Sequence, residues 1–312
     1  MGGPWSRTAV LCWLALAIVL LPLSSARAFS SISVEDLRTV GTPPKTMIAQ
    51  LSAPMPAGKD DVVFEEPSLF GPGEQAKTPG KEADGCAPAD TGKELPRVAI
   101  IIDDMGHHHQ LGAALLALEM NLTFSFLPQA PFSREQGKQA WQQGHDILVH
   151  MPMEALDPAW DPGPGTLYLA DPLAEVARKV AQNMASVPHA VGINNHMGSR
   201  YTESEAAMRQ FFKLLAGQHL LFVDSGTSSA SVAMETARAM GFKAARRHVF
   251  LDNVQSQEDI CRQLKQLVSE ASERGWAIAI GHPNEATLTA LTRCRELLQS
   301  RVRLVGIHEL VR

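Results

Sequence analysis

Residues 97–106 read RVAIIIDDMG, an apolar run that ends abruptly in two aspartates. Consecutive branched apolar residues of this kind are typical of a strand buried on both faces, as in a parallel sheet covered by helices. In such folds the ligands and catalytic groups lie at the carboxyl ends of the strands. The stretch therefore predicts an α/β fold and also predicts where chemically active side chains should be found.

Similar apolar runs recur along the chain, and helical patterns with apolar residues three or four apart separate them. The runs are residues 122–127, 146–149, 190–193, 220–223, 277–280 and 302–305. The helical patterns are residues 111–118, 133–143, 172–186, 203–216, 231–240, 259–274 and 284–300. This alternation predicts parallel strands with helical crossovers, in one α/β barrel or open sheet that spans residues 95–312.

The part of the chain before residue 95 has a different character. Residues 1–28 combine a basic residue, an apolar run at 10–21 and Ala26-Arg27-Ala28, which predicts a signal peptide cleaved after Ala28. An uncleaved anchor is the alternative, but the run is shorter than the roughly 20 residues of a bilayer span. Residues 29–94 are rich in Pro, Gly, Ser, Lys and Glu, which predicts a flexible linker. We therefore expect an exported protein of the periplasm.

Composition excludes some classes of function. The formal net charge is −5, so the chain lacks the basic surface expected of a nucleic-acid-binding protein. Cys86, Cys261 and Cys294 follow the predicted signal peptide, an odd number without C-x-x-C spacing. This argues against a disulfide framework and against a structural zinc knuckle. A single Cys261–Cys294 bridge stays open, because it depends on geometry that sequence does not contain.

Nearly every apolar run ends in side chains that can bind a metal, transfer a proton or hold a substrate. Each has an ordinary structural explanation by itself, such as an aspartate that caps the next helix. Their recurrence at one predicted rim instead indicates a common site. The candidates are Asp103, Asp104, His150, Glu154, Asn194, Asn195, His196, Asp224, Arg247, Asp252 and His282.

The residue types in this set point to metal-assisted hydrolysis. Two histidines and one carboxylate, with a position left for water, match a mononuclear catalytic metal, so we expect Asp104, His150 and His196 to be its ligands. Asp103 would then take a proton from the metal-bound water, and His282 would protonate the leaving group. Within this set of residues no serine lies in a G-x-S-x-G elbow, which disfavours a serine hydrolase.

Seven blocks occur in a characteristic order: IIIDDMG, FLPQAP, HMPME, GINNHMGSR, FVDSGT, VFLDN and AIAIGHP. From residue 97 to the C-terminus the chain thereby resembles the divergent polysaccharide deacetylases. The resemblance implies a distorted (β/α)7-type barrel of mainly parallel strands and a divalent metal, most commonly zinc. It also implies Asp103 as general base, Asp104 as metal ligand and His282 as catalytic acid.

One departure from the wider deacetylase group leaves the third ligand open. That group carries two metal histidines in an H-x-x-x-H element, whereas here the block runs from His150 to Glu154. Either Glu154 or His196 completes the set, and we expect His196, because imidazole suits zinc better than a second carboxylate. The remaining candidates are expected to contact the substrate or support the ligands: Glu154, Asn194, Asn195, Asp224, Arg247 and Asp252.

The predicted function is a metal-dependent hydrolase that deacetylates an N- or O-acetylated glycan or cell-wall polymer of the envelope. The first alternative is a catalytically inactive glycan-binding or regulatory module in envelope remodelling, with an envelope protein as partner of residues 29–94. The second is hydrolysis of an amide in a cell-wall peptide by the same rim. Product analysis would separate the second alternative from deacetylation.

Overall fold

The computed structural model describes residues 94–311 of the chain. The predicted signal peptide and the predicted linker, except for its last residue, lie outside the described residues. Among the helices that are described, none combines the length and the apolar character needed to cross a bilayer.

The strands form one parallel sheet whose order differs from their order in the chain. The sheet runs β6-β5-β4-β3-β2-β1-β8-β7, with the short β9 beside β1. The strands are β1 (Arg97–Met105), β2 (Thr123–Phe126), β3 (Asp146–Met153), β4 (Gly192–Met197), β5 (Leu221–Asp224), β6 (Ala244–Arg246), β7 (Val249–Phe250), β8 (Trp276–Gly281) and β9 (Arg303–Leu304).

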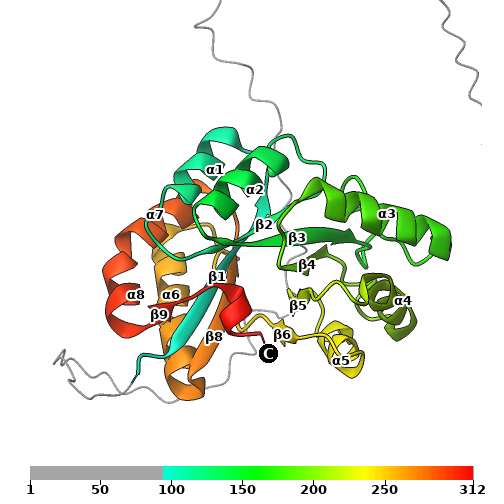
Figure 1. Ribbon diagram of the computed structural model, residues 1–312. Helices are drawn as coiled ribbons and strands as arrows, with labels where there is room; N and C mark the ends of the chain where they lie inside the picture. Colours follow the sequence, from blue (N-terminus) through cyan, green and yellow to red (C-terminus); the bar gives the residue numbers. More distant parts are fainter. Residues whose placement is uncertain (1–93, 312) are drawn as a thin grey trace, which may run out of the picture. The chain divides into compact units, whose positions relative to one another are not determined.

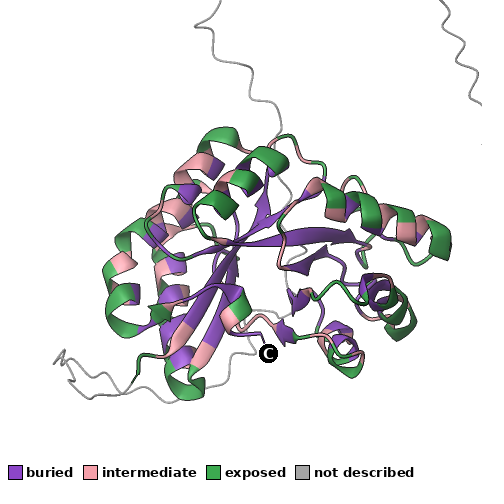
Figure 2. Ribbon diagram, viewed as in Figure 1, coloured by how far each residue is buried: buried purple, intermediate pink, exposed green. Residues whose placement is uncertain are grey.

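The helices pack around the outside of the strands (Figure 1). Apart from the short edge strand β9, the strands are mostly buried, whereas the outer sides of the helices are exposed (Figure 2). In α4, for example, Met208, Phe211 and Phe212 face the core, and the Ser204 side chain caps the first turn by accepting from the Ala207 amide. The helices are α1 (His109–Leu116), α2 (Ser133–Gln142), α3 (Leu173–Ser186), α4 (Glu205–Leu215), α5 (Ala233–Ala239), α6 (Gln257–Arg274), α7 (Glu285–Arg293), α8 (Arg295–Arg301) and the 3-10 turn η2 (Ile307–Glu309).

The sheet closes through a strand that is shared between its two edges. β6 pairs with β5, where Phe222 lies opposite Ala244, and β7 pairs with β8, where Val249 lies opposite Ala279. Only two residues separate β6 from β7. One extended segment therefore crosses from one edge to the other. Counted as a single strand, it makes seven with β1 to β5 and β8, so the prediction of a distorted (β/α)7-type barrel is confirmed.

The interior of the barrel is apolar at one end and is filled there by the C-terminal segment. This segment lies where the strands begin: the Ile307 amide donates to Thr123 Oγ1 at 3.2 Å, and the His308 amide donates to Asp146 Oδ2 at 2.9 Å. The interior cluster comprises Ala99, Ile101, Leu148, Leu221, Val223, Ala245, Ile278, Ile280, Val305, Ile307, Leu310 and Val311. Only the opposite end of the barrel, at the carboxyl ends of the strands, is left for a site.

Shortening Ile307 should destabilise the whole barrel, because its side chain is fully buried in the interior cluster. We expect Ile307→Ala to lower the free energy of unfolding by about 2–5 kcal/mol, measured by urea denaturation. Val254→Ala is a control, because Val254 is 57% exposed, and it should change stability by less than about 0.5 kcal/mol. Equal stability of the two variants would contradict this role for the C-terminal segment.

Cys261 on α6 and Cys294 at the junction of α7 and α8 form a disulfide. Their Cα atoms lie 6.3 Å apart, within the range that the bond requires, and 33 residues separate them in sequence. A cross-link over a loop of this length restricts the unfolded chain. We expect Cys261→Ser with Cys294→Ser to lower the free energy of unfolding by about 2–4 kcal/mol. In reductant, the free energy of unfolding of the wild-type protein should fall by a similar amount. Unchanged denaturation midpoints would contradict the prediction.

Candidate metal centre

The polar residues of the site continue the rows of side chains that fill the barrel interior. Successive side chains of a strand point to opposite faces, so residues two apart share a face. Asp103 therefore follows Ile101 in β1, His150 follows Leu148 in β3, and His282 follows Ile280 beyond β8. All three polar side chains are fully buried. The candidate site thus lies directly on top of the apolar interior.

Asp104 reaches this site by breaking the alternation. Regular β1 geometry would turn it away from Asp103, but its φ is +52°, in the left-handed region. The pairing of β1 with β2 also shifts register between Ile102 and Met105. Such irregularities re-aim side chains next to active sites, and a non-glycine residue in this conformation costs roughly 1–2 kcal/mol. The cost is in keeping with a functional position for Asp104.

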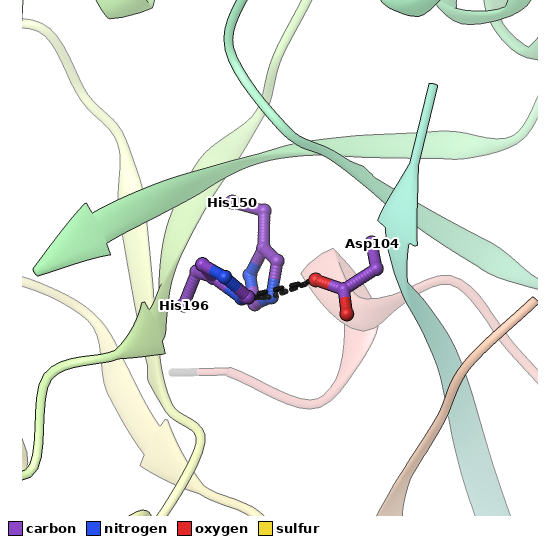
Figure 3. A group of neighbouring side chains, drawn as sticks. All are labelled: Asp104, His150 and His196. Carbon is purple, nitrogen blue, oxygen red and sulfur yellow. Dashed lines mark hydrogen bonds and ion pairs between the residues drawn. The ribbon is translucent and has the colours of Figure 1, made fainter. Parts of the chain in front are cut away.

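Asp104, His150 and His196 come together in one buried group (Figure 3). Asp104 Oδ1 lies 3.0 Å from His196 Nδ1 and 3.2 Å from His150 Nε2, and the two nitrogens lie 3.2 Å apart. Apart from these two imidazoles, the Asp104 carboxylate has no hydrogen-bond partner among the residues described. A buried carboxylate whose polar neighbours are two imidazole nitrogens is the arrangement expected of metal ligands.

The spacing and chemistry of these three atoms fit a divalent cation. Ligand atoms of a tetrahedral zinc site lie roughly 3.3–3.5 Å apart when the bonds measure about 2.0–2.1 Å. The observed separations are 3.0–3.2 Å. Two imidazoles with one carboxylate also form the donor set of several catalytic zinc sites. The residues present therefore fit such an ion.

The two adjacent carboxylates differ in proton affinity. Burial raises the pKa of Asp103, and this outweighs the opposing charges of His150 and His282. Burial also acts on Asp104, but the charge of His196 and contacts with both imidazoles hold its pKa well below the usual range. Environments that separate neighbouring carboxylates in this way assign them different roles. Asp104 is suited to bind a cation, and Asp103 to accept a proton.

His282 is held by a carboxylate on its far side. Its Nδ1 lies 3.0 Å from Asp252 Oδ1, and its backbone amide donates to Asp252 Oδ2 at 2.7 Å. Asn284 and Thr287 donate to the same oxygen. Burial raises the pKa of Asp252, but the charge and hydrogen bonds of His282 outweigh it, so the pKa is lowered. Asp252 therefore fixes the orientation of the His282 ring.

The structure brings His196 rather than Glu154 into the three-residue group. The Glu154 carboxylate accepts from the Leu169 amide at 2.6 Å and lies 3.3 Å from Arg200 Nη1. It thus holds the loop that follows β3. Of the two alternatives left open by the sequence, the geometry favours His196.

The other predicted residues lie around the site with different partners. Asp224 accepts from Gly226, Ser231 and Arg246, which joins β5 to the segment before α5 and to β6. Asn195 accepts from the Ser225 amide and donates to the Met197 carbonyl, so it braces the end of β4 against β5.

Arg247 and Asn194 lie closer to the proposed catalytic groups. Arg247 donates to the Ser225 and Gly226 carbonyls, and its guanidinium lies over the Phe250 ring, which contacts His282. Asn194 contacts Asp103 and His150 directly.

Two serines that contact Asn194 were not among the predicted site residues. Ser125 in β2 donates to Asn194 Oδ1, and Ser225 after β5 accepts from Asn194 Nδ2. A polar residue inside the apolar run 122–127 is a signal in the sequence, but it does not identify a partner 69 residues away. The partner depends on how β2 and β4 are placed in the barrel.

Comparisons with known proteins agree with this fold. A family model described as divergent polysaccharide deacetylase matches residues 100–311. An uncharacterized protein of Haemophilus influenzae is 37% identical over 216 residues, 69% of this chain and 77% of the relative. The uncharacterized protein YibQ of Escherichia coli is 34% identical over 215 residues, 69% of this chain and 67% of the relative.

A solved structure shows the same architecture. The crystal structure of an uncharacterized protein from Agrobacterium tumefaciens aligns with a TM-score of 0.67 at 26% sequence identity. The alignment covers 72% of this chain and 93% of that chain. The family model covers residues 100–311, which include Asp104, His150 and His196. The chain therefore belongs to the divergent polysaccharide deacetylase family.

Proposed function

We propose that the protein is a metal-dependent hydrolase that removes acetyl groups from an N- or O-acetylated polysaccharide of the cell envelope. The observation that carries the proposal is the buried group of Asp104, His150 and His196, with Asp103 beside it. His282, the fifth group, is fully buried and follows Ile280 on the inner face of the barrel. Family membership supports the deacetylation of a polysaccharide.

Each of these residues would have a distinct role in acyl hydrolysis. Asp104, His150 and His196 would hold the cation, and the donor set favours zinc. When bound, such an ion lowers the pKa of water and polarises an acyl oxygen. Asp103 accepts the proton of the attacking water at its carboxylate. His282 donates a proton from Nε2 to the leaving nitrogen or oxygen, while Asp252 holds Nδ1 and stabilises the imidazolium.

Acetate release is the direct test of this proposal. Purified protein loaded with one equivalent of zinc should release acetate from acetylated chitooligosaccharides or acetylated muropeptides. Absence of acetate across a broad panel, with the metal bound stoichiometrically, would contradict it. Glycan binding without release of any product would instead favour a regulatory module, and cleavage of a peptide amide would favour hydrolysis of a cell-wall peptide.

We also propose that the protein acts in the periplasm. The predicted signal peptide at residues 1–28 supports this, and so does the Cys261–Cys294 disulfide, because such bonds persist in oxidising compartments. Cell fractionation followed by N-terminal sequencing tests the proposal. A mature protein found in the cytoplasm with residue 1 intact would contradict it, and a membrane-bound protein with residue 1 intact would favour the uncleaved anchor.

A further inference from the structure

Asn194 is a fully buried amide that touches both the proposed base and a proposed metal ligand. Its Nδ2 donates to the two oxygens of Asp103 at 2.8 and 2.9 Å and to Ser225 Oγ at 3.2 Å. Its Oδ1 lies 3.0 Å from His150 Nδ1 and accepts from Ser125 Oγ at 2.5 Å. A side-chain amide can donate two hydrogens and accept at two lone pairs. In Asn194 all of these groups have partners.

The chemistry of the neighbours determines the orientation of this amide. Both oxygens of Asp103 lie within 2.9 Å of the same end of Asn194, and at least one of them carries no hydrogen, so this end must be the nitrogen. The oxygen then faces His150, and His150 Nδ1 must carry the hydrogen of that contact. In a neutral imidazole the other nitrogen is then an acceptor. This places a lone pair on His150 Nε2, the atom that lies 3.2 Å from Asp104.

We propose that Asn194 is a positioning residue that couples the proton acceptor of the site to its metal ligand. Its donor half holds the Asp103 carboxylate, and its acceptor half holds His150 in the tautomer that can bind a cation. The inference rests on the proposed function and names a residue on which that function depends. A carboxylate, a hydroxyl of serine or an apolar side chain cannot supply both halves from this position.

The position of Asn194 in the barrel explains why one residue reaches both partners. It lies opposite His150 in the pairing of β3 with β4, and two residues before His196 on the same face of β4. Ser125 and Ser225, from β2 and from the end of β5, complete the network from either side. A buried network with every polar group satisfied specifies one geometry, because any rearrangement would leave a group without a partner.

Two substitutions test the donor and the acceptor functions of the Asn194 amide. Asn194→Asp keeps an acceptor for His150 but loses the donor to Asp103. The new carboxylate has no N–H to donate, so the Asp103 carboxylate is no longer held in place. Asn194→Leu removes both halves at similar volume. Asn183→Asp is the control, because Asn183 is an equally buried amide that bonds Gly165 and Gln129 instead.

Zinc affinity, kcat and the His150 tautomer should be measured on the complete chain, the tautomer by imidazole 15N chemical shifts of the metal-free protein. Asn194→Asp should lower kcat about 100-fold while zinc binds at least as tightly as in the wild type. Asn194→Leu should weaken zinc binding about 10–100-fold and mix the His150 tautomers. Asn183→Asp should lower stability but leave zinc affinity and kcat of the folded protein unchanged.

Several results would overturn the inference. These are a wild-type His150 with its hydrogen on Nε2, an Asn194→Leu variant with wild-type zinc affinity and tautomer, or equal effects of the Asn194 and Asn183 substitutions. Failure of the proposed function has a different signature. Wild-type protein would then bind no zinc or release no acetate, while the 15N shifts would still show whether Asn194 sets the His150 tautomer.

Discussion

Asp104→Ala should lose its zinc, with an affinity at least about 100-fold below that of the wild type. Substituting a residue that only orients a metal ligand lowers metal affinity about 10–100-fold. Substituting a ligand itself should therefore lower the affinity more. Alanine also removes the charge that both imidazoles face at 3.0 and 3.2 Å. Competition with a chromophoric chelator measures the affinity, and metal analysis after dialysis gives the stoichiometry.

A matched pair of variants tests which third residue binds the ion. His196→Ala should weaken zinc binding as Asp104→Ala does, whereas Glu154→Gln should keep it, because Glu154 is engaged by the Leu169 amide and Arg200. The opposite result, with zinc lost from Glu154→Gln and retained by His196→Ala, would show that the ligand set proposed from the structure is wrong. The folded state of each variant should be checked by circular dichroism.

Asp103→Asn and His282→Ala should each lower kcat by about 10²–10⁴-fold without loss of zinc. A correctly positioned general base or acid accelerates a reaction by about this factor, so its removal should slow the reaction equally. Asparagine at position 103 keeps the size of the side chain and an acceptor for Asn194, so the change is mainly the loss of a proton acceptor. Acetate release by metal-loaded protein measures kcat, and metal content measured in parallel excludes an indirect effect.

Two outcomes would contradict these catalytic roles. The first is a variant that retains wild-type kcat. The second is a loss of activity that extra zinc restores, which would mean that the residue acts through the metal. If both variants release no acetate yet support normal growth in place of the wild type, a role in envelope remodelling without catalysis would be favoured.

Much of the fold follows from local pattern. Apolar runs and helical periods along residues 95–312 predict the order of strands and helices, because burial on both faces of a parallel strand excludes polar residues. One prediction needs refinement at the C-terminal end. The helical pattern of residues 284–300 is interrupted at Cys294, which divides it into α7 and α8.

The sequence by itself also placed the main chemical groups at one rim. Asp103, His150 and His282 each follow an apolar run, and strands in parallel end at the same edge. In the structure, alternation within a strand turns them inward together with Asn194 and His196. The prediction of a common rim needs only the direction of the strands, which the alternation of apolar runs and helical patterns indicates.

Tertiary structure alone decided the remaining features. The left-handed conformation that turns Asp104 inward, the contacts of Glu154 with Leu169 and Arg200, and the approach of Cys261 to Cys294 all depend on how the chain packs rather than on local pattern. The same holds for the strand shared between the two edges of the sheet. Residue patterns encode which face of an element is buried, but register, backbone irregularities and cross-links are set by the packing of the whole barrel.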